Sequence, residues 1–367
     1  MSAPTDDNGS PSRRPARRQV GRAVFSIVVV GVIYFGVLPQ IADVGDVWNQ
    51  IRAMTPIEVA TLVVAAVWNL VTYLFVVLPA LPGLTWGQGV VVTQSTTAAS
   101  NVLPAGAAVG IGMTYAMYSS WGFPRSESAL AILVSGVWNT FMKLGLPVLA
   151  LALLALSGDA NVARVTAGLV GIAALLGGIG IFWLMLRNDD MARRVGGLAG
   201  AFVSKMRRVV RRPPVTGWGE GAVRFRSQTT RLLRRAWVRL TVGGLVSHLS
   251  LFVVLLITLR HVGVSEGEVG WIEVLAAFAF VRLLSALPIT PGGVGVVELG
   301  LTAALVAAGG DRAQVVAAVL VFRGLTYLLP VPVGALCYII WRRKSSWRKA
   351  IEPETPPAPV VLGEPGA

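Results

Sequence analysis

The sequence predicts an all-helical protein that crosses a membrane several times. Of its 367 residues, 54% are hydrophobic and only 14% are charged, whereas soluble domains carry about 25% charged residues. Several uncharged runs reach the ~20 residues that an α-helix needs to cross the hydrocarbon core. Two further apolar stretches are interrupted by proline and glycine, which predicts a departure from simple spanning helices.

Six uninterrupted apolar segments are predicted to span the bilayer as single helices. Segment 20–38 lacks a small-residue cleavage site and is followed by more apolar segments, so we expect a retained first helix rather than a removed signal peptide. The flanking segments 1–19 and 342–367 are polar, rich in proline and predicted to be disordered. The six predicted spans are 20–38, 56–80, 127–157, 165–186, 239–260 and 313–341.

The two interrupted stretches are predicted to form re-entrant hairpins. Stretch 88–120 is broken at Asn101–Gly106, and stretch 271–308 is broken between Pro288 and Gly295. Each half is shorter than the ~20 residues of a full span. A break at membrane depth frees backbone groups that hydrocarbon cannot satisfy, so it is tolerated where it is buried in protein or lines a polar cavity. The breaks are therefore the best indication of a functional site.

The distribution of basic residues supports these hairpins. Of the 32 Lys and Arg residues, 24 lie in 1–22, 187–239 and 341–367, and strongly basic segments remain on the cytoplasmic side. With both stretches as hairpins, every strongly basic segment falls on that side. A single span in place of either hairpin would put some of them outside. We therefore expect an inverted repeat, at 56–157 and 239–341, with oppositely inserted hairpins and cytoplasmic termini.

The basic segment 187–238 also shows helical periodicity. It is predicted to form two interfacial amphipathic helices separated by Arg212–Pro214, with anionic lipid headgroups as partners; the alternative is a solvated loop that only fixes topology. Because the net charge of +14 lies beside membrane spans, it does not indicate nucleic-acid binding. The periodic residues are Met191, Val195, Leu198, Phe202, Met206 and Val209, then Phe225, Thr229, Leu232, Leu233, Ala236, Trp237 and Leu240.

Few ionisable side chains fall within the predicted membrane segments, and such residues are functional candidates because they are costly in hydrocarbon. Their surplus of positive charge favours an anionic headgroup as ligand. A structural or snorkelling role is the preferred interpretation of Lys143 and Arg282, whereas a structural ion pair and ligand contact remain equal alternatives for Glu298 and Arg323. The candidate substrate-binding residues are Lys143, Arg282, Glu298, Arg323, Pro104, Gly106, Pro291, Gly292, Gly293 and Gly295.

Little in the sequence predicts catalysis or a cofactor. Glu298 has no paired carboxylate within the membrane, since Glu273 is expected nearer an interface, and His248 and His261 are the only histidines. No metal cluster, nucleotide-binding glycine loop or Ser/His/Asp arrangement is recognisable. The single cysteine, Cys337, excludes an intrachain disulfide. We therefore expect no cofactor, no metal and no enzymatic activity.

Several motifs resemble those of a known family. The segment Leu287-Pro-Ile-Thr-Pro-Gly-Gly-Val-Gly-Val-Val-Glu298, followed by Phe322-Arg323-Gly-Leu-Thr-Tyr-Leu-Leu-Pro330 and Gly334, is similar to a signature of the lysylphosphatidylglycerol synthase transmembrane family, also called the flippase-like membrane domain. Asn101–Gly106 resembles the motif of its first half, and Ser126–Ala131 resembles the start of the next helix. The resemblance covers residues 20–341.

This resemblance implies a protein that binds a lipid or lipid-linked substrate and moves it between leaflets. Relatives move aminoacylated phosphatidylglycerol or are linked to hopanoids and lipid-linked glycans. Arg makes up 28 of the 32 basic residues, which suggests a GC-rich genome and a bacterial inner membrane. The short segment after the last span predicts no soluble synthase domain. Two alternatives remain, a membrane-embedded transferase acting on a lipid-linked substrate and a non-transporting partner that docks a cytoplasmic enzyme; a homo-oligomer is compatible with each.

Overall fold

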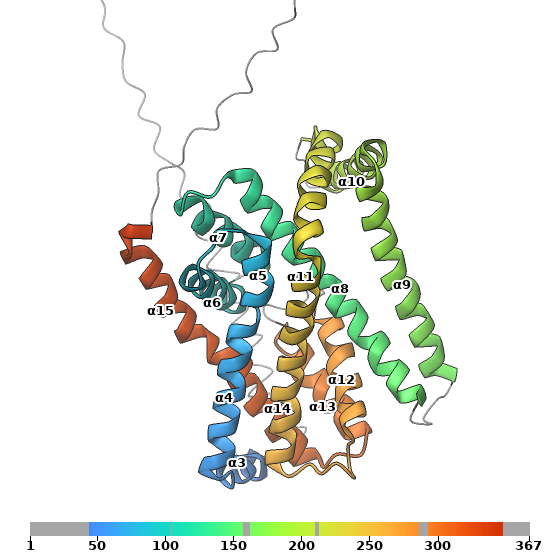
Figure 1. The fold of residues 1–367 in the computed structure, drawn as a ribbon. Coiled ribbons are helices and arrows are strands. Elements are labelled where there is room, and N and C mark those ends of the chain that lie inside the picture. Colours follow the sequence, from blue (N-terminus) through green and yellow to red (C-terminus); the bar gives the residue numbers. More distant parts are fainter. Residues whose placement is uncertain (1–43, 104, 157–161, 210–212, 286–292, 348–367) are drawn as a thin grey trace, which may run out of the picture.

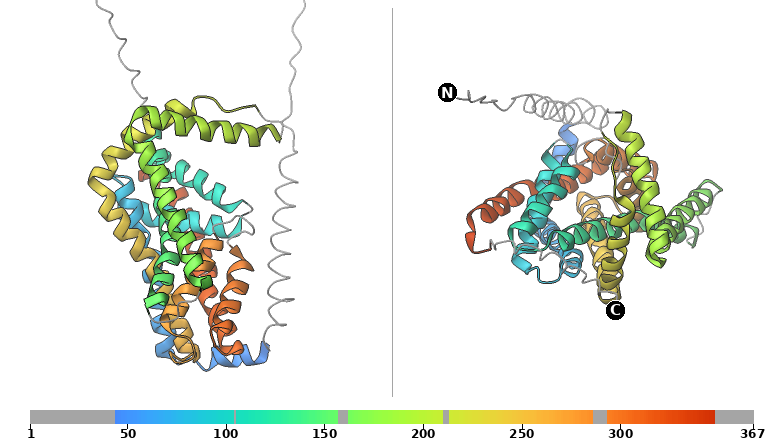
Figure 2. Two further views of the ribbon diagram at one scale, coloured as in Figure 1. Left: turned by 90° about the vertical axis from the view of Figure 1, so that its right-hand side faces the viewer. Right: turned by 90° about the horizontal axis from the view of Figure 1, so that it is seen from above.

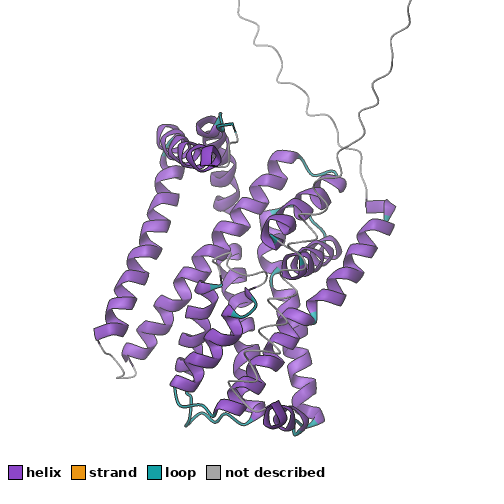
Figure 3. Cartoon of the chain, turned by 180° about the vertical axis from the view of Figure 1, so that it is seen from behind, coloured by secondary structure: helices purple, strands orange, loops and turns teal. Residues whose placement is uncertain are grey.

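The structure is a computed structural model that describes residues 44–103, 105–156, 162–209, 213–285 and 293–347. Within these ranges the chain forms helices and connecting loops only (Figure 3), so the predicted all-helical class is confirmed. The predicted first span and both predicted disordered termini lie outside the described residues, apart from the first few residues of the C-terminal segment.

Five of the described helical segments are long and apolar enough to cross a membrane, which agrees with five of the six predicted spans. Helices α4 (Pro56–Thr72) and α5 (Leu74–Ala80) form the first of them (Figure 1). The others are α8 (Arg125–Leu156), α9 (Val162–Arg187), α11 (Trp218–Val262), and the consecutive α14 (Arg312–Arg323), η3 (Gly324–Leu328) and α15 (Pro330–Arg343). In α9, the segment that is long and apolar enough is Gly168–Arg187.

Both interrupted stretches form pairs of packed helices. Helix α6 (Trp86–Val102) packs against α7 (Gly106–Ser120), and α12 (Trp271–Leu284) packs against α13 (Val296–Ala307). A residue with positive φ precedes the second helix of each pair, with φ of 56° at Ala105 and 83° at Gly295. Figure 1 shows α6 and α7 in the upper half of the bundle and α12 and α13 in the lower half. The two hairpins therefore occupy opposite ends of the molecule.

Local sequence signals explain where several helices begin. At α4, the Thr55 side chain accepts a hydrogen bond from the Glu58 amide, the Glu58 carboxylate accepts one from the Thr55 amide, and Pro56 occupies the first helical position. Thr85 and Gln88 form the same reciprocal cap at α6. These side chains satisfy amide groups that the first turn of a helix leaves without partners.

The last predicted span, 313–341, is not a single α-helix. It consists of α14, the π-helix η3 and α15, and the amide of Leu329 donates to the carbonyl of Gly324 at 2.9 Å. The physical reason is Pro330, which has no amide hydrogen and therefore interrupts the helical hydrogen-bond ladder. Helix α14 packs against α11 and α13, while α15 packs along α6. The break therefore lets one segment contact both hairpins.

The basic segment also differs from its prediction. Its first predicted amphipathic helix is α10 (Asp189–Val209), which lies across one end of the bundle (Figure 2). The second is wrong as a separate interfacial element, because Phe225–Leu240 belongs to the continuous 45-residue helix α11. Its periodic residues Leu232, Ala236 and Leu240 are buried in the protein core rather than facing a membrane surface. Burial against neighbouring helices thus accounts for this periodicity.

The described residues form two buried hydrophobic clusters. One surrounds the α12–α13 hairpin and includes Leu255 and Phe278. The other surrounds the α6–α7 hairpin and includes Met117 and Val134. Helices α8 and α11 contribute residues to both clusters. Each half of the molecule therefore has its own core, and these two long helices connect the halves.

Candidate functional site

The carboxylate of Glu298 is held at the beginning of α13. Its side chain is fully buried, and one oxygen, Oε2, accepts a hydrogen bond from the Gly295 amide at 2.7 Å. The other oxygen, Oε1, accepts from Nε of Arg323 at 2.7 Å. Arg323 ends α14 and is only 6% exposed. The pair therefore joins the second hairpin to the last span in the interior of the protein.

A chain of contacts continues from this pair to the first hairpin. The guanidinium of Arg323 lies 4.3 Å from the ring centre of Tyr327, which belongs to η3. The hydroxyl of Tyr327 donates to the carbonyl of Asn101 at 2.8 Å, and Nδ2 of Asn101 donates to the carbonyl of Tyr327 at 3.2 Å. Glu298, Arg323, Tyr327 and Asn101 thus link the inner ends of both hairpins through the π-helix.

Three candidate residues at the breaks, Gly106, Gly293 and Gly295, lie within the described residues. A Cβ atom on Gly106 would lie 2.0 Å from the carbonyl oxygen of Ser100, so only glycine lets α6 and α7 approach this closely. Gly293 and Gly295 have φ of 68° and 83°, a region that glycine adopts without strain. Pro104, Pro291 and Gly292 lie outside the described residues.

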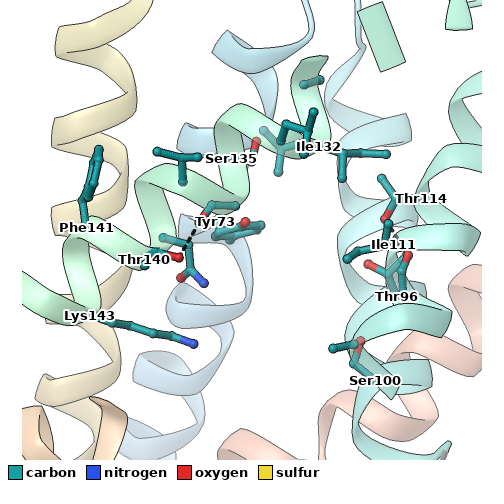
Figure 4. A pocket seen from close by; sticks show the side chains of 18 of the residues that line it. Tyr73, Thr96, Ser100, Ile111, Thr114, Ile132, Ser135, Thr140, Phe141 and Lys143 are labelled. Atoms are coloured by element: carbon teal, nitrogen blue, oxygen red, sulfur yellow. Dashed lines mark hydrogen bonds between the residues drawn. The ribbon is translucent and has the colours of Figure 1, made fainter. Parts of the chain in front are cut away.

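A cavity of about 1100 Å³ lies beside the first hairpin. One wall is formed by α6 and α7, which contribute Thr96, Ser100 and Thr114, and the other by α8, which contributes Ser135 and Thr140 (Figure 4). Helices α5, α9, α11 and α12 also contribute to the lining. Its apolar portion includes aromatic and aliphatic side chains of α8 and α9, among them Phe141, Ile181 and Phe182.

Lys143 and Arg282 both line this cavity. Figure 4 shows Lys143 extending from α8 into the space in front of the wall that carries Ser100. The two cations are near enough for their charges to interact, and Arg282 also interacts with the charge of Arg323. Nε of Arg282 is buried without a hydrogen-bond partner among the described residues. Among the described residues that line the cavity, none is an Asp or a Glu.

The four charged candidates therefore fall into two groups. Glu298 and Arg323 neutralise each other and hold helices together, whereas Lys143 and Arg282 present positive charge to a cavity. A cavity with two cations can bind an anion, because Lys and Arg donate charge-assisted hydrogen bonds to anionic oxygens. The hydroxyl groups of Thr96 and Ser100 donate to the backbone carbonyls of Val92 and Gly106, so they make the wall polar without adding free donors. No group of three or more His, Cys, Asp and Glu side chains that could hold a metal ion occurs in the described ranges.

Sequence reasoning missed the polar walls of this cavity. Thr93 and Thr97, and likewise Thr96 and Ser100, are four residues apart in α6; residues at this spacing share a face of a helix. In α8, Ser135 and Asn139 have the same spacing and also line the cavity. A search for uncharged polar residues at helical spacing within apolar segments would have found both walls.

Comparison with known proteins gives a family. The lysylphosphatidylglycerol synthase TM region matches residues 23–334, which include both hairpins, the ion pair and the cavity. The chain belongs to this family. The resemblance of its Pro/Gly motif is thereby confirmed. A search of the curated proteins found no match. Membership of the lysylphosphatidylglycerol synthase TM family identifies a multi-pass membrane protein associated with lipid handling.

Proposed function

We propose that this protein binds a lipid in the cavity beside α6 and α7 and moves it between the leaflets of a bacterial inner membrane. The observation that carries this proposal is the cavity itself, which combines polar walls, two cations and an apolar face formed by α8 and α9. A headgroup requires the polar part, and acyl chains require the apolar part. The proposed activity makes and breaks no covalent bond, which separates it from the transferase alternative.

The arrangement of the hairpins supports an inverted repeat of two re-entrant pairs. Figure 1 places α6–α7 and α12–α13 at opposite ends and places α10 and the end of α15 toward the same end as the first hairpin. Both α10 and α15 end in basic residues. By the positive-inside rule this end is cytoplasmic. The first hairpin would then enter from the cytoplasm and the second from the outside, with both termini cytoplasmic.

Movement of the two halves relative to each other is the proposed mechanism. Each half has its own core, and the inner ends of the hairpins meet through Asn101, Tyr327, Arg323 and Glu298. Transporters built from inverted repeats expose a central site alternately by such motions. The π-helix between α14 and α15 is a candidate hinge, because π-helical segments are frequent at functional sites.

Filling the cavity tests the proposal. Gly136 lines the cavity, and a Cβ atom there would meet nothing within 4 Å. Gly136→Leu is expected to remove at least nine-tenths of the lipid that co-purifies with the protein, measured by native mass spectrometry from mild detergent. Vesicles containing the variant should move that lipid between leaflets at the rate of protein-free vesicles, measured by reduction of a fluorescent analogue exposed outside.

Gly177→Leu is the matched control. Gly177 lies on the exposed face of α9, outside the cavity lining, and a Cβ atom there also meets nothing within 4 Å. This variant should retain the lipid and the transfer rate of the wild type. Equal behaviour of both variants, or a wild-type rate no higher than that of protein-free vesicles, would contradict the proposed function.

Helix α10 is proposed to lie on the cytoplasmic membrane surface. Gly196 and Gly200 pack directly against Trp218 at the start of α11, and this leaves an apolar stripe facing outward. Two ion pairs, Arg193–Glu220 and Arg226–Asp189, also connect α10 with its neighbours. The stripe consists of Leu198, Phe202 and Met206, which are 73%, 65% and 59% exposed. An exposed apolar stripe on a basic helix is typical of binding to anionic lipid surfaces.

Spin labels can test this placement in a Cys337→Ala background. A nitroxide at Phe202→Cys should be more accessible to oxygen than to a water-soluble nickel chelate. Helical geometry places Arg208 about 120° around α10 from Phe202, so a label at Arg208→Cys should show the reverse order. Preferential access of the nickel chelate to position 202 would contradict membrane contact and favour the alternative that this surface docks a cytoplasmic protein.

A further inference from the structure

The charges of the cavity indicate the class of lipid that it accepts. Its lining, as far as the structure describes it, includes Lys143 and Arg282 but neither Asp nor Glu. Neither cation forms an ion pair with any described carboxylate, whereas Arg323, in the same region, is neutralised by Glu298. Positive charge in a partly apolar site is costly without a counterion. The site is therefore electrostatically incomplete until an anion enters it.

The surrounding polar groups match an anion with several oxygen atoms. Lys143 offers three hydrogen-bond donors, and Arg282 offers a planar set of donors that matches phosphate geometry. The Nε atom of Arg282 is buried without a partner in the described part of the chain. Across the cavity, Ser100 and Thr96 of α6 make the wall polar (Figure 4), while their hydroxyl groups donate to the backbone carbonyls of Gly106 and Val92. The two cationic donors come from different elements, α8 and α12, so they converge only in the folded protein.

The apolar part of the lining favours a lipid over a water-soluble anion. Ile181, Phe182 and Met185 of α9 and Phe141 of α8 contribute to the same cavity as the two cations. Every residue of Gly168–Arg187 in α9 is exposed or half-buried, so the cavity wall formed by α9 would border the lipid. An acyl chain can therefore extend along α8 and α9 while the headgroup remains beside Lys143.

From these observations we infer that the substrate is a lipid with a net anionic, phosphate-bearing headgroup and that Lys143 and Arg282 bind this phosphate. The inference rests on the proposed lipid site and names its ligand class. It also disfavours an aminoacylated, cationic headgroup, since a third positive charge beside Lys143 and Arg282 would be repelled. The cavity thus selects phosphatidylglycerol-like lipids over their aminoacyl esters.

A competition experiment tests the charge selectivity directly. Purified protein in mild detergent is incubated with equimolar phosphatidylglycerol, its lysyl ester, phosphatidylcholine and diacylglycerol of identical acyl chains, and bound species are counted by native mass spectrometry. We expect occupancy by phosphatidylglycerol at least tenfold above that of the lysyl ester and of diacylglycerol. Glycerol 3-phosphate in hundredfold excess should not displace it, which distinguishes a lipid phosphate from a free one.

Variants assign the selectivity to the two cations. Lys143→Met and Arg282→Met should each lower phosphatidylglycerol occupancy about tenfold, the effect of losing one charge-assisted hydrogen bond, while Lys143→Arg should retain most of it. Arg312→Met removes an exposed charge at the start of α14, outside the cavity lining, and should change nothing. An unchanged melting temperature shows that a variant is folded. If Arg282→Met does not fold, the comparison of Lys143→Met with Lys143→Arg still tests whether the charge at position 143 binds the lipid.

Three results would overturn the inference. They are equal or preferred binding of the lysyl ester, displacement by glycerol 3-phosphate, and unchanged selectivity in folded Lys143→Met protein. In each of these cases a lipid that is lost in Gly136→Leu but retained in Gly177→Leu would leave the proposed function standing. If both variants retained the lipid, the lipid site itself would be contradicted. Failure of the headgroup inference and failure of the proposed function are therefore distinguishable.

Discussion

Glu298→Gln is expected to lower the free energy of unfolding by about 3–5 kcal/mol, the range for removing one partner of a buried ion pair. Both carboxylate oxygens are in use, one by the Gly295 amide and one by Nε of Arg323. A glutamine supplies one oxygen and no negative charge. The positive charge of Arg323, which is only 6% exposed, would then lose its ion pair with Glu298. We expect the second hairpin and the π-helix to separate first.

Chemical or thermal unfolding in detergent measures this loss, and Glu220→Gln provides the control. It makes the same chemical change in an ion pair whose side chains, Arg193 and Glu220, are 51% and 61% exposed. Exposed pairs contribute about 0–1 kcal/mol, so the control should remain close to the wild type. Equal stability of the two variants would show that the buried pair is not a structural connection. It would favour the alternative that Glu298 binds a ligand.

Gly334→Ala is expected to destabilise the protein by about 1–3 kcal/mol, the usual effect of overpacking a closely packed interior. A Cβ atom at Gly334 would lie 2.2 Å from the carbonyl oxygen of Gln94 and 2.4 Å from Cβ of Ala98. Because the first of these atoms is backbone, α15 must move away from α6. Small residues at membrane helix interfaces permit this kind of close approach.

Gly112→Ala is the matched control for this substitution. Gly112 lies within α7, and a Cβ atom there would meet nothing within 4 Å. Within a helix, alanine is more favourable than glycine by about 1 kcal/mol. The Gly112→Ala variant should therefore be as stable as the wild type or slightly more stable. In Gly334→Ala, by contrast, the displacement of α15 should also weaken the contacts between Tyr327 and Asn101. A Gly334→Ala protein that unfolds no earlier than Gly112→Ala would contradict the packing of α15 on α6.

Most of the helical order could be predicted from the sequence. Hydropathy and length predict spanning helices because hydrocarbon leaves few alternatives to a fully hydrogen-bonded backbone. The interruptions at Asn101–Gly106 and Pro288–Gly295 predicted two helix pairs, and both pairs are present. Two details were wrong. Pro330 was not recognised as a break in the last span, and the periodicity of Phe225–Leu240 was assigned to a membrane surface, although a buried helix face produces the same pattern.

The candidate site could be predicted only in part. The sequence identifies Lys143, Arg282, Glu298 and Arg323 as ionisable groups in an apolar setting, and the cost of charge in hydrocarbon makes each a candidate. It does not show which charges are paired. Glu298 and Arg323 lie 25 positions apart and meet through helix packing, whereas Lys143 and Arg282 reach one cavity from α8 and α12.

The sequence by itself determined that this is a multi-pass helical membrane protein of the lysylphosphatidylglycerol synthase TM family, since composition, hydropathy and the Pro/Gly motif are properties of consecutive residues. Only the tertiary structure decided that one cation is neutralised while two others face a cavity, and that η3 joins the inner ends of the two hairpins. Pairing and cavity formation depend on distances between residues far apart in the chain, and those distances are set by helix packing.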